Sequence, residues 1–274
     1  MKFQDALLSD KIFNFIDIPA NKYYGNVPIT GLEPQYVRKI GDYAFKDNTI
    51  ISKLKMPYCT SIGAFAFYSS KSVAERQLIW ELTLNFNNIT SDISANTFYR
   101  TATNGNPSRS GSPGSWLTNN LSASFLDVRN ICNGAFRVDG STYIPYPGTS
   151  SFSRCDSSLS LNFKNINTIE SNAFFVKADS RGGTNYSTAV ANFTLNAENV
   201  NNIKYSFLNV QSSCTWSTNE ARKNVYINIK NVNTIENNAF GGNMITSLSI
   251  PNKFRTRAEL VRIGVGNPDR FKID

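Results

Sequence analysis

Hydrophobic and polar residues recur along the chain in one phased pattern. A nine-residue motif appears as VRKIGDYAF at Val37–Phe45 and returns as CTSIGAFAF at Cys59–Phe67. It consists of an aliphatic slot, two polar residues, Ile, three variable residues, a small residue and Phe. Further copies are Ile89–Phe98 (one residue longer), Val128–Phe136, Ile166–Phe174, Val200–Phe207 (one shorter) and Val232–Phe240. Such phased self-similarity predicts coils that stack on one another.

A second pattern precedes each copy after the first. Apolar residues stand five and three places before the aliphatic slot, at Leu54 and Met56, Leu84 and Phe86, Ala123 and Phe125, Leu161 and Phe163, Leu195 and Ala197, and Ile227 and Ile229. This alternation with period two predicts short strands with one buried face. Asn165, Asn199 and Asn231 stand at the strand ends. A stacked column of Asn would satisfy the donors of the turns from coil to coil.

The repeat length and the motif letters point to one family. The aliphatic slots at positions 37, 59, 89, 128, 166, 200 and 232 lie 22 to 39 residues apart, so the shortest step matches a leucine-rich repeat of about 20–29 residues. Leu54–Phe67 (LKMPYCTSIGAFAF) and Thr246–Asn252 (TSLSIPN) resemble the BspA-type, or treponemal, leucine-rich repeats. The resemblance covers about residues 32–253, although only the first two copies keep Gly after the Ile.

This family resemblance implies an elongated, non-catalytic binding surface without a cofactor, of the kind found in bacterial and protist surface proteins and in some phage proteins. We predict a leucine-rich-repeat solenoid of about seven coils plus caps, mainly β. Short parallel strands line one face, and irregular or single-turn helical segments holding the Ala–Phe pairs line the other. Residues 32–253 form the solenoid, residues 1–31 an N-terminal cap or docking arm with a short amphipathic helix, and residues 254–274 a C-terminal cap.

Polar insertions separate each Phe from the next strand. They cover residues 101–120, 138–158, 177–190 and 211–223 and are rich in Gly, Ser, Pro and Asn. We expect them to be surface loops that emerge from one edge of the solenoid. Their aromatic residues are Trp116, Tyr143, Tyr146, Tyr186 and Trp216. These rings either anchor a glycan or protein partner or fold back to hold the long loops in place.

The composition limits the chemistry. The chain of 274 residues is 41% hydrophobic, which suffices for a continuous core, and it contains no histidine. The commonest general base and metal ligand are therefore missing, as are all Ser-His and Cys-His nucleophiles. The four cysteines form no CxxC pair, so we predict buried or free thiols, with a Cys132–Cys155 disulfide as an alternative. We predict no catalytic residue, no metal site and no cofactor.

Charge and hydropathy bear on the partners and the localisation that we expect for the protein. The net charge is +8, but the basic residues are scattered, so we expect no specific nucleic-acid binding. No apolar run is long enough for membrane insertion. Acidic and basic residues interrupt the N-terminal apolar runs, so no signal peptide is evident. We expect a virion or cell-surface protein if a leader is missing from this sequence, and otherwise a cytoplasmic one.

The exposed strand positions form the candidate binding face. They stand four and two places before the aliphatic slot, at Lys55, Asn85, Asn87, Asn162, Lys164, Asn196, Asn228 and Lys230, with Glu198 as the single carboxylate. Amide and lysine groups suit many hydrogen bonds to a glycan or a protein strand and do not suit cleavage. Trp116, Tyr146 and Trp216 complete the predicted partner-binding set. Glu170 and Glu236 fill the same repeat slot, so we interpret them as repeat decoration.

We therefore expect a non-enzymatic recognition or structural module that binds a protein or glycan partner. Two settings compete: a phage virion or host-attachment component, which would also contact other virion proteins, and a bacterial surface adhesin. An intracellular scaffold or inhibitor built from the same repeats is the alternative. A β-solenoid enzyme that degrades glycans is a further, less favoured one.

Overall fold

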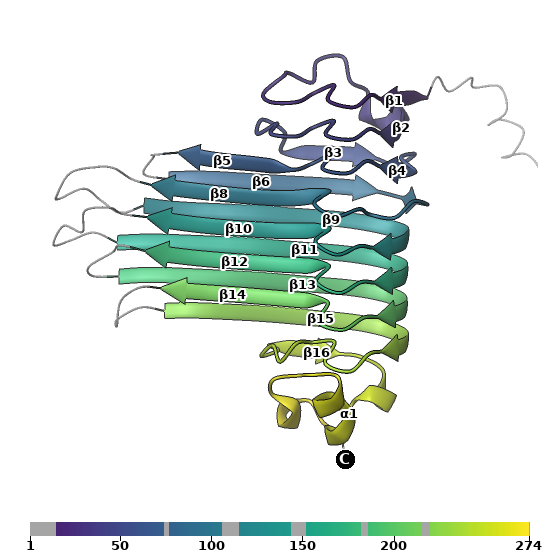
Figure 1. Ribbon diagram of the computed structural model, residues 1–274, viewed down its shortest axis with the longest axis vertical. Coiled ribbons are helices and arrows are strands. Elements are labelled where there is room, and N and C mark those ends of the chain that lie inside the picture. The colour runs from purple at the N-terminus through teal and green to yellow at the C-terminus, as the bar shows by residue number, and fades with distance from the viewer. Residues whose placement is uncertain are drawn as a thin grey trace, which may run out of the picture.

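The computed structural model describes residues 15–73, 77–105, 115–143, 152–181, 186–214 and 220–273. These residues form a parallel β-solenoid whose coils stack along one long axis, with mostly strands and little helix (Figure 1). The predicted solenoid class is thereby confirmed. Most of the predicted N-terminal amphipathic helix lies outside the described residues.

Every strand pairs in parallel, within three sheets. The largest sheet contains β3 (Lys53–Met56), β6 (Gln77–Phe86), β9 (Ser115–Ile131), β11 (Phe152–Ile169), β13 (Tyr186–Ile203), β15 (Glu220–Ile235) and β16 (Ser247–Ser249), and β7 (Asn88–Ile89) pairs with β9. The second contains β5 (Ser69–Val73), β8 (Phe98–Gly105), β10 (Phe136–Tyr143), β12 (Phe174–Arg181) and β14 (Leu208–Cys214). The third contains β1 (Ile16–Ile18), β2 (Val37–Ile40) and β4 (Ser61–Ile62).

The pairing register follows the sequence repeat. Leu54 lies beside Leu84, and Phe125 lies beside Phe163, so equivalent slots become neighbours across the sheet. Ile18 on β1 pairs with Ile40 on β2 in the same way. Stacking therefore begins at β1, before the predicted start of the solenoid at residue 32.

A single column of aromatic rings runs through the core. It starts at Tyr23 and continues through Phe45, Phe67, Phe98, Phe136, Phe174, Phe207 and Phe240, with neighbouring ring centroids 4.7–6.0 Å apart. The first rings are stacked, whereas Phe207, in the copy that lacks one residue, meets Phe174 and Phe240 edge-on at 84° and 80°. The predicted alignment of the seven Phe residues is thus observed. Tyr23 extends the column by one coil that the sequence pattern did not reveal.

A second column stands edge-on against the first. Phe86, Phe125 and Phe163 stack on one another at 5.4 and 5.0 Å, and Phe125 meets Phe136 at 81°. Offset stacks and edge-to-face contacts are the favoured aromatic geometries. The next coil has only Ala197 at this slot, and Phe193 packs against the first column instead, 5.4 Å from Phe174. The core volume is therefore conserved although the repeat is not.

A left-handed residue shapes the turn before each column ring. The residues with positive φ at this place are Asn21, Tyr43, Phe65, Asn96, Gly134, Asn172, Ser206 and Asn238. Asn and Gly adopt this conformation at low cost, whereas the aromatic residues do not. Tyr43 and Phe65 stack on each other at 5.1 Å, which offsets part of that cost. The expected irregular segments are thus observed before the column rings, but Phe98, Phe136 and Phe174 already begin strands β8, β10 and β12, which the sequence prediction did not include.

The insertions differ from the expected surface loops. Most of their described residues form the second sheet and the N-terminal halves of β9, β11, β13 and β15, which together project sideways from the solenoid as a two-layered arm (Figure 1). Inward-facing positions of these strands alternate with outward ones. The loop prediction was wrong because each insertion pairs with its equivalents in the neighbouring coils, a long-range partner that local composition cannot reveal.

Part of the interior of the arm consists of small and hydroxylated residues. A methyl group on Gly140 would lie 2.9 Å from Cys155 Sγ and 3.2 Å from Leu117 Cδ2, so only glycine fits between the sheets there. Ser153 Oγ bonds Ser180 Oγ at 2.6 Å and Ser187 Oγ at 3.1 Å inside the arm. Close packing and hydroxyl pairing replace the bulky apolar core found in the solenoid proper.

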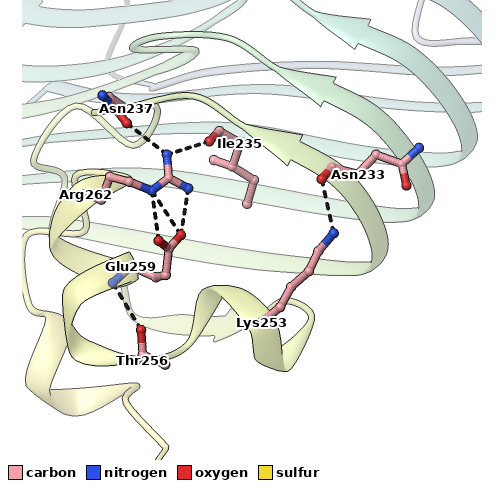
Figure 2. Close-up of polar contacts among 7 residues, drawn as sticks. All are labelled: Asn233, Ile235, Asn237, Lys253, Thr256, Glu259 and Arg262. Carbon is pink, nitrogen blue, oxygen red and sulfur yellow. Dashed lines mark hydrogen bonds and ion pairs between the residues drawn. The ribbon is translucent and has the colours of Figure 1, made fainter.

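A helical cap closes the C-terminal end. It contains η2 (Asn252–Phe254), α1 (Arg257–Arg262) and η3 (Pro268–Arg270), and the short η1 (Pro34–Tyr36) lies near the other end. Figure 2 shows Arg262 bonded to Glu259 and donating to the carbonyl oxygen of Ile235 at 3.0 Å. Lys253 donates to the carbonyl oxygen of Asn233 at 3.1 Å (Figure 2). The cap thus satisfies carbonyl groups that a further coil would otherwise bind.

Candidate partner-binding groove

The groove arises where the long strands bend. In β9 the strict alternation ends at Phe125, because Leu126 and Asp127 are both exposed before Val128 is buried again. Outward side chains from both sides of this bend, such as Ser124 and Leu126, line the same pocket. The same bend recurs in the neighbouring strands, which pair in register. The corners align into a groove of about 620 Å³ that runs along the solenoid axis.

The eight predicted strand residues all line this groove. One wall carries Lys55, Asn85, Ser124, Asn162, Asn196 and Asn228, and the other carries Asn87, Leu126, Lys164, Glu198 and Lys230. The walls correspond to the fourth and second positions before the aliphatic slot. The structure therefore brings the predicted strand positions together, and partner binding by them stays a prediction.

The charges in the groove are mainly positive. Lys230 Nζ lies 3.5 Å from Glu198 Oε1, and both side chains are exposed. Lys55 and Lys164 are also exposed and form no ion pair with any described residue. Since water screens exposed pairs, the Lys230–Glu198 contact contributes little to stability. The two unpaired ammonium groups are free to meet an anionic partner.

The amide wall is partly ordered by its own hydrogen bonds. Asn196 Nδ2 donates to Asn162 Oδ1 at 2.9 Å, and Asn162 Nδ2 donates to Ser124 Oγ at 3.5 Å. Each amide carries two N–H donors and two acceptor lone pairs, so at least one donor and one acceptor of Asn162 and of Asn196 remain for a partner. These bonds restrain the two amides before any ligand binds.

The predicted aromatic residues lie elsewhere. Trp116 lies on β9, in the arm, with 40% of its surface exposed, and it does not line the groove. Tyr143 ends β10 and is half exposed. Tyr146 and Trp216 lie outside the described residues, as does the side chain of Tyr186. The structure therefore joins none of the described insertion aromatics to the groove.

Two asparagine ladders flank a second, shallower groove of about 420 Å³. In one, Asn231 donates to Asn199 at 2.9 Å and Asn199 to Asn165 at 2.7 Å. The other joins Asn233, Asn201, Asn167 and Asn130 at 2.8–3.2 Å. The predicted Asn column therefore exists, but its side chains bond one another and not the turn backbone. The second ladder was missed, although Asn167, Asn201 and Asn233 each stand one place after an aliphatic slot.

A ladder of rings and cations on the opposite side of the coils was also missed. Tyr68 stacks on Tyr99 at 4.8 Å, and the Arg137 guanidinium lies 4.9 Å from the Tyr99 ring and 4.2 Å from the Phe175 ring. These residues stand directly after the column Phe of their repeats, together with Lys46. Each such contact contributes about 0.5–1 kcal/mol at exposed sites.

Several acidic residues and thiols of the described ranges are occupied by hydrogen bonds or by burial. Lys204 lies between Glu170 and Glu236 in the stack, and its hydrogen bond lowers the pKa of the Glu236 carboxyl. All four cysteines are free, so the alternative Cys132–Cys155 disulfide is absent. Burial raises the pKa of Cys59 and Cys155 to about 12, which keeps both thiols protonated and unreactive. In the described ranges, no three His, Cys, Asp or Glu side chains gather into a metal site.

Part of the chain is similar to a known repeat family. Residues 16–101 match, in six copies, the family model described as BspA type Leucine rich repeat region. The later coils lie beyond the matched residues but stack in register with them. No curated protein and no solved structure shows a significant match. Across the described ranges, no helix has the length and hydrophobicity to cross a bilayer.

Proposed function

Because residues 16–101 are a BspA-type leucine-rich repeat region, we propose that this protein is a recognition module whose groove binds an elongated protein or glycan partner. Leucine-rich repeat solenoids are modules of protein interaction and adhesion. The observation that carries the proposal is the convergence of eight repeat-related side chains on one groove along the axis. Such a surface lets a ligand make the same contact on successive coils.

Binding, and not bond cleavage, fits the chemistry of the groove. General acid–base hydrolysis of a glycan uses two carboxyl groups about 5–10 Å apart. Among the lining residues Glu198 is the single carboxylate, and Lys230 engages it. The other lining groups are amides, hydroxyls, ammonium groups and apolar side chains. The groove therefore supports a non-enzymatic role over a glycan-degrading one.

The biological setting we favour is a surface. BspA-type repeats are typical of surface or extracellular proteins. A phage virion or host-attachment component and a bacterial surface adhesin both fit a preformed groove that meets a polymer outside the cell. An intracellular scaffold would use the same groove on a protein partner, and the nature of the ligand separates these roles.

An array of neutral glycans, acidic glycans and surface proteins tests the proposal. The triple variant Asn85→Ala, Asn162→Ala, Asn228→Ala removes amides from the groove. The matched control Asn201→Ala, Asn233→Ala removes exposed amides from an Asn ladder outside it. We expect at least one ligand to bind the wild type and the control and to lose most of its binding to the triple variant. Equal binding by all three proteins, or none to any probe, would refute a role of this groove.

A further inference from the structure

We propose that the groove takes an acidic polysaccharide that lies along the solenoid axis, with acidic groups directed at Lys55 and Lys164. This inference rests on the proposed function and names the ligand class of the same site. Three observations carry it: the direction of the groove, the type of polar group on its walls, and the placement of its unpaired charges.

The groove offers a peptide no open strand edge along β9, β11 and β13. Each of these strands has a neighbouring strand on both sides, although Leu126, Lys164 and Glu198 fall in a one-residue gap of the paired register at the bend. A peptide cannot add as a further strand between strands that are already neighbours. Recognition in the groove is therefore expected to rest mainly on side chains.

The walls match the hydroxyl groups of a sugar. A sugar hydroxyl both donates and accepts hydrogen bonds, and an Asn amide with a free N–H and a free carbonyl lone pair can form both kinds of bond with it. The wall positions stand on successive strands, about 4.8 Å apart, so a chain of sugar units meets an amide at Asn85, a hydroxyl at Ser124 and further amides from Asn162 onward. Leu126, with 44% of its surface exposed, gives an apolar patch to the face of one ring.

The two unpaired lysines of the groove favour an acidic chain that runs along the groove between Lys55 and Lys164. Lys55 on β3 and Lys164 on β11 are three strands apart in the sheet, which is about 14 Å along the groove. Neither has a carboxylate partner within the described residues, and the only carboxylate in the groove, Glu198, is held by Lys230 at its C-terminal end. An acidic chain is thus attracted along the Lys55-to-Lys164 stretch and gains less beyond it.

The test is titration of the full chain with three soluble probes of about ten units: an oligogalacturonate, the same oligomer with its carboxylates methyl-esterified, and a polyglutamate peptide. We expect the oligogalacturonate to bind and to weaken steeply as salt rises, and the ester to bind at least about tenfold more weakly, since esterification removes only the charge. Polyglutamate is expected to bind more weakly than the oligogalacturonate.

Charge variants locate the site. Lys55→Gln and Lys164→Gln together should weaken oligogalacturonate binding about tenfold or more and flatten its salt dependence. Lys22→Gln, at an exposed lysine outside the groove, should leave both unchanged. The inference is overturned if the ester binds equally well, if polyglutamate binds better, if no acidic probe binds, or if the lysine pair has no effect. These outcomes leave the proposed function intact if a ligand of the array binds the wild type and loses its binding to the Asn85→Ala, Asn162→Ala, Asn228→Ala variant.

Discussion

The guanidinium of Arg100 lies flat over the indole ring of Trp80, with Cζ 3.8 Å from the ring centroid, and both residues are buried, with 1% and 3% of their surface exposed. Its Nε donates to Asn119 Oδ1 at 3.4 Å. Burial lowers the pKa of Arg100 to about 9, so the group stays charged at neutral pH. The pair fills the arm between β6 and β8, where the next coil has the smaller residues Asn119 and Val138 at the equivalent positions.

Replacing the buried charge tests this arrangement. Arg100→Met keeps the length of the side chain and removes the desolvated charge, so we expect unfolding at equal or higher denaturant concentration, with a gain of up to about 2 kcal/mol. Arg100→Lys keeps the charge but loses the planar stack on Trp80, so it should destabilise the protein. Denaturant unfolding compares the two variants, and a less stable methionine variant would contradict the expectation.

The aromatic column predicts a steep dependence of stability on single rings. Phe136→Ala removes contacts with Phe98, Phe174 and both neighbours in the second column, so it should cost about 3–5 kcal/mol. Ile50→Ala, at an exposed apolar residue, should change stability by less than about 0.5 kcal/mol. Chemical denaturation measures both values, and equal losses at the two positions would show that the rings do not form a shared core.

The amide ladder that begins at Asp92 predicts a pH-dependent contribution. Arg129 and Asn130 donate to the Asp92 carboxylate, and the Arg129 bond lowers the pKa of this carboxyl from its usual 3.8. A carboxyl with a lowered folded pKa stabilises the protein above its unfolded pKa and loses this effect as pH falls through the folded value. Asp92→Asn should therefore destabilise the protein at pH 7, by about 0.5 kcal/mol because the pair is exposed.

Thermal unfolding at pH 7 and pH 3 tests the Asp92 expectation. The difference between wild type and Asp92→Asn should be smaller at pH 3 than at pH 7, because the lower pH lies below the unfolded pKa of 3.8, where the stabilising effect begins to decline toward the lowered folded pKa. A difference of the same size at both pH values would assign the effect to packing and not to charge.

Lys223 is an exposed lysine on β15, at the unpaired edge of the arm. It pairs in register with the buried, inward-facing Ala191, yet it is exposed because residues 220–224 of β15 have no described strand on their other side. An inward-pointing charge on an edge strand opposes edge-to-edge pairing. Lys223→Val should therefore promote self-association at high protein concentration, measured by light scattering. Lys22→Val serves as the exposed-lysine control, and equal association of both variants would refute this role.

The sequence alone determined the features that depend on local period. The spacing of the Ile and Phe slots predicted a column of rings, and the alternation before each slot predicted parallel strands, because stacked coils place equal slots side by side. The same alternation predicted which Asn and Lys residues share one face. The repeat period is visible in the order of residues along the chain, so a single sequence is enough to predict which slots stack.

Tertiary structure decided what depends on contacts between distant residues. The segment that runs from Phe98 into the first insertion alternates buried and half-buried residues, but its polar and small side chains form a strand only by pairing with equivalent segments more than thirty residues away. The bend at Leu126 brings residues of one strand face together into a groove. Local alternation alone decides neither feature, since the free energy that favours each comes from neighbouring coils and not from the residues' own propensities.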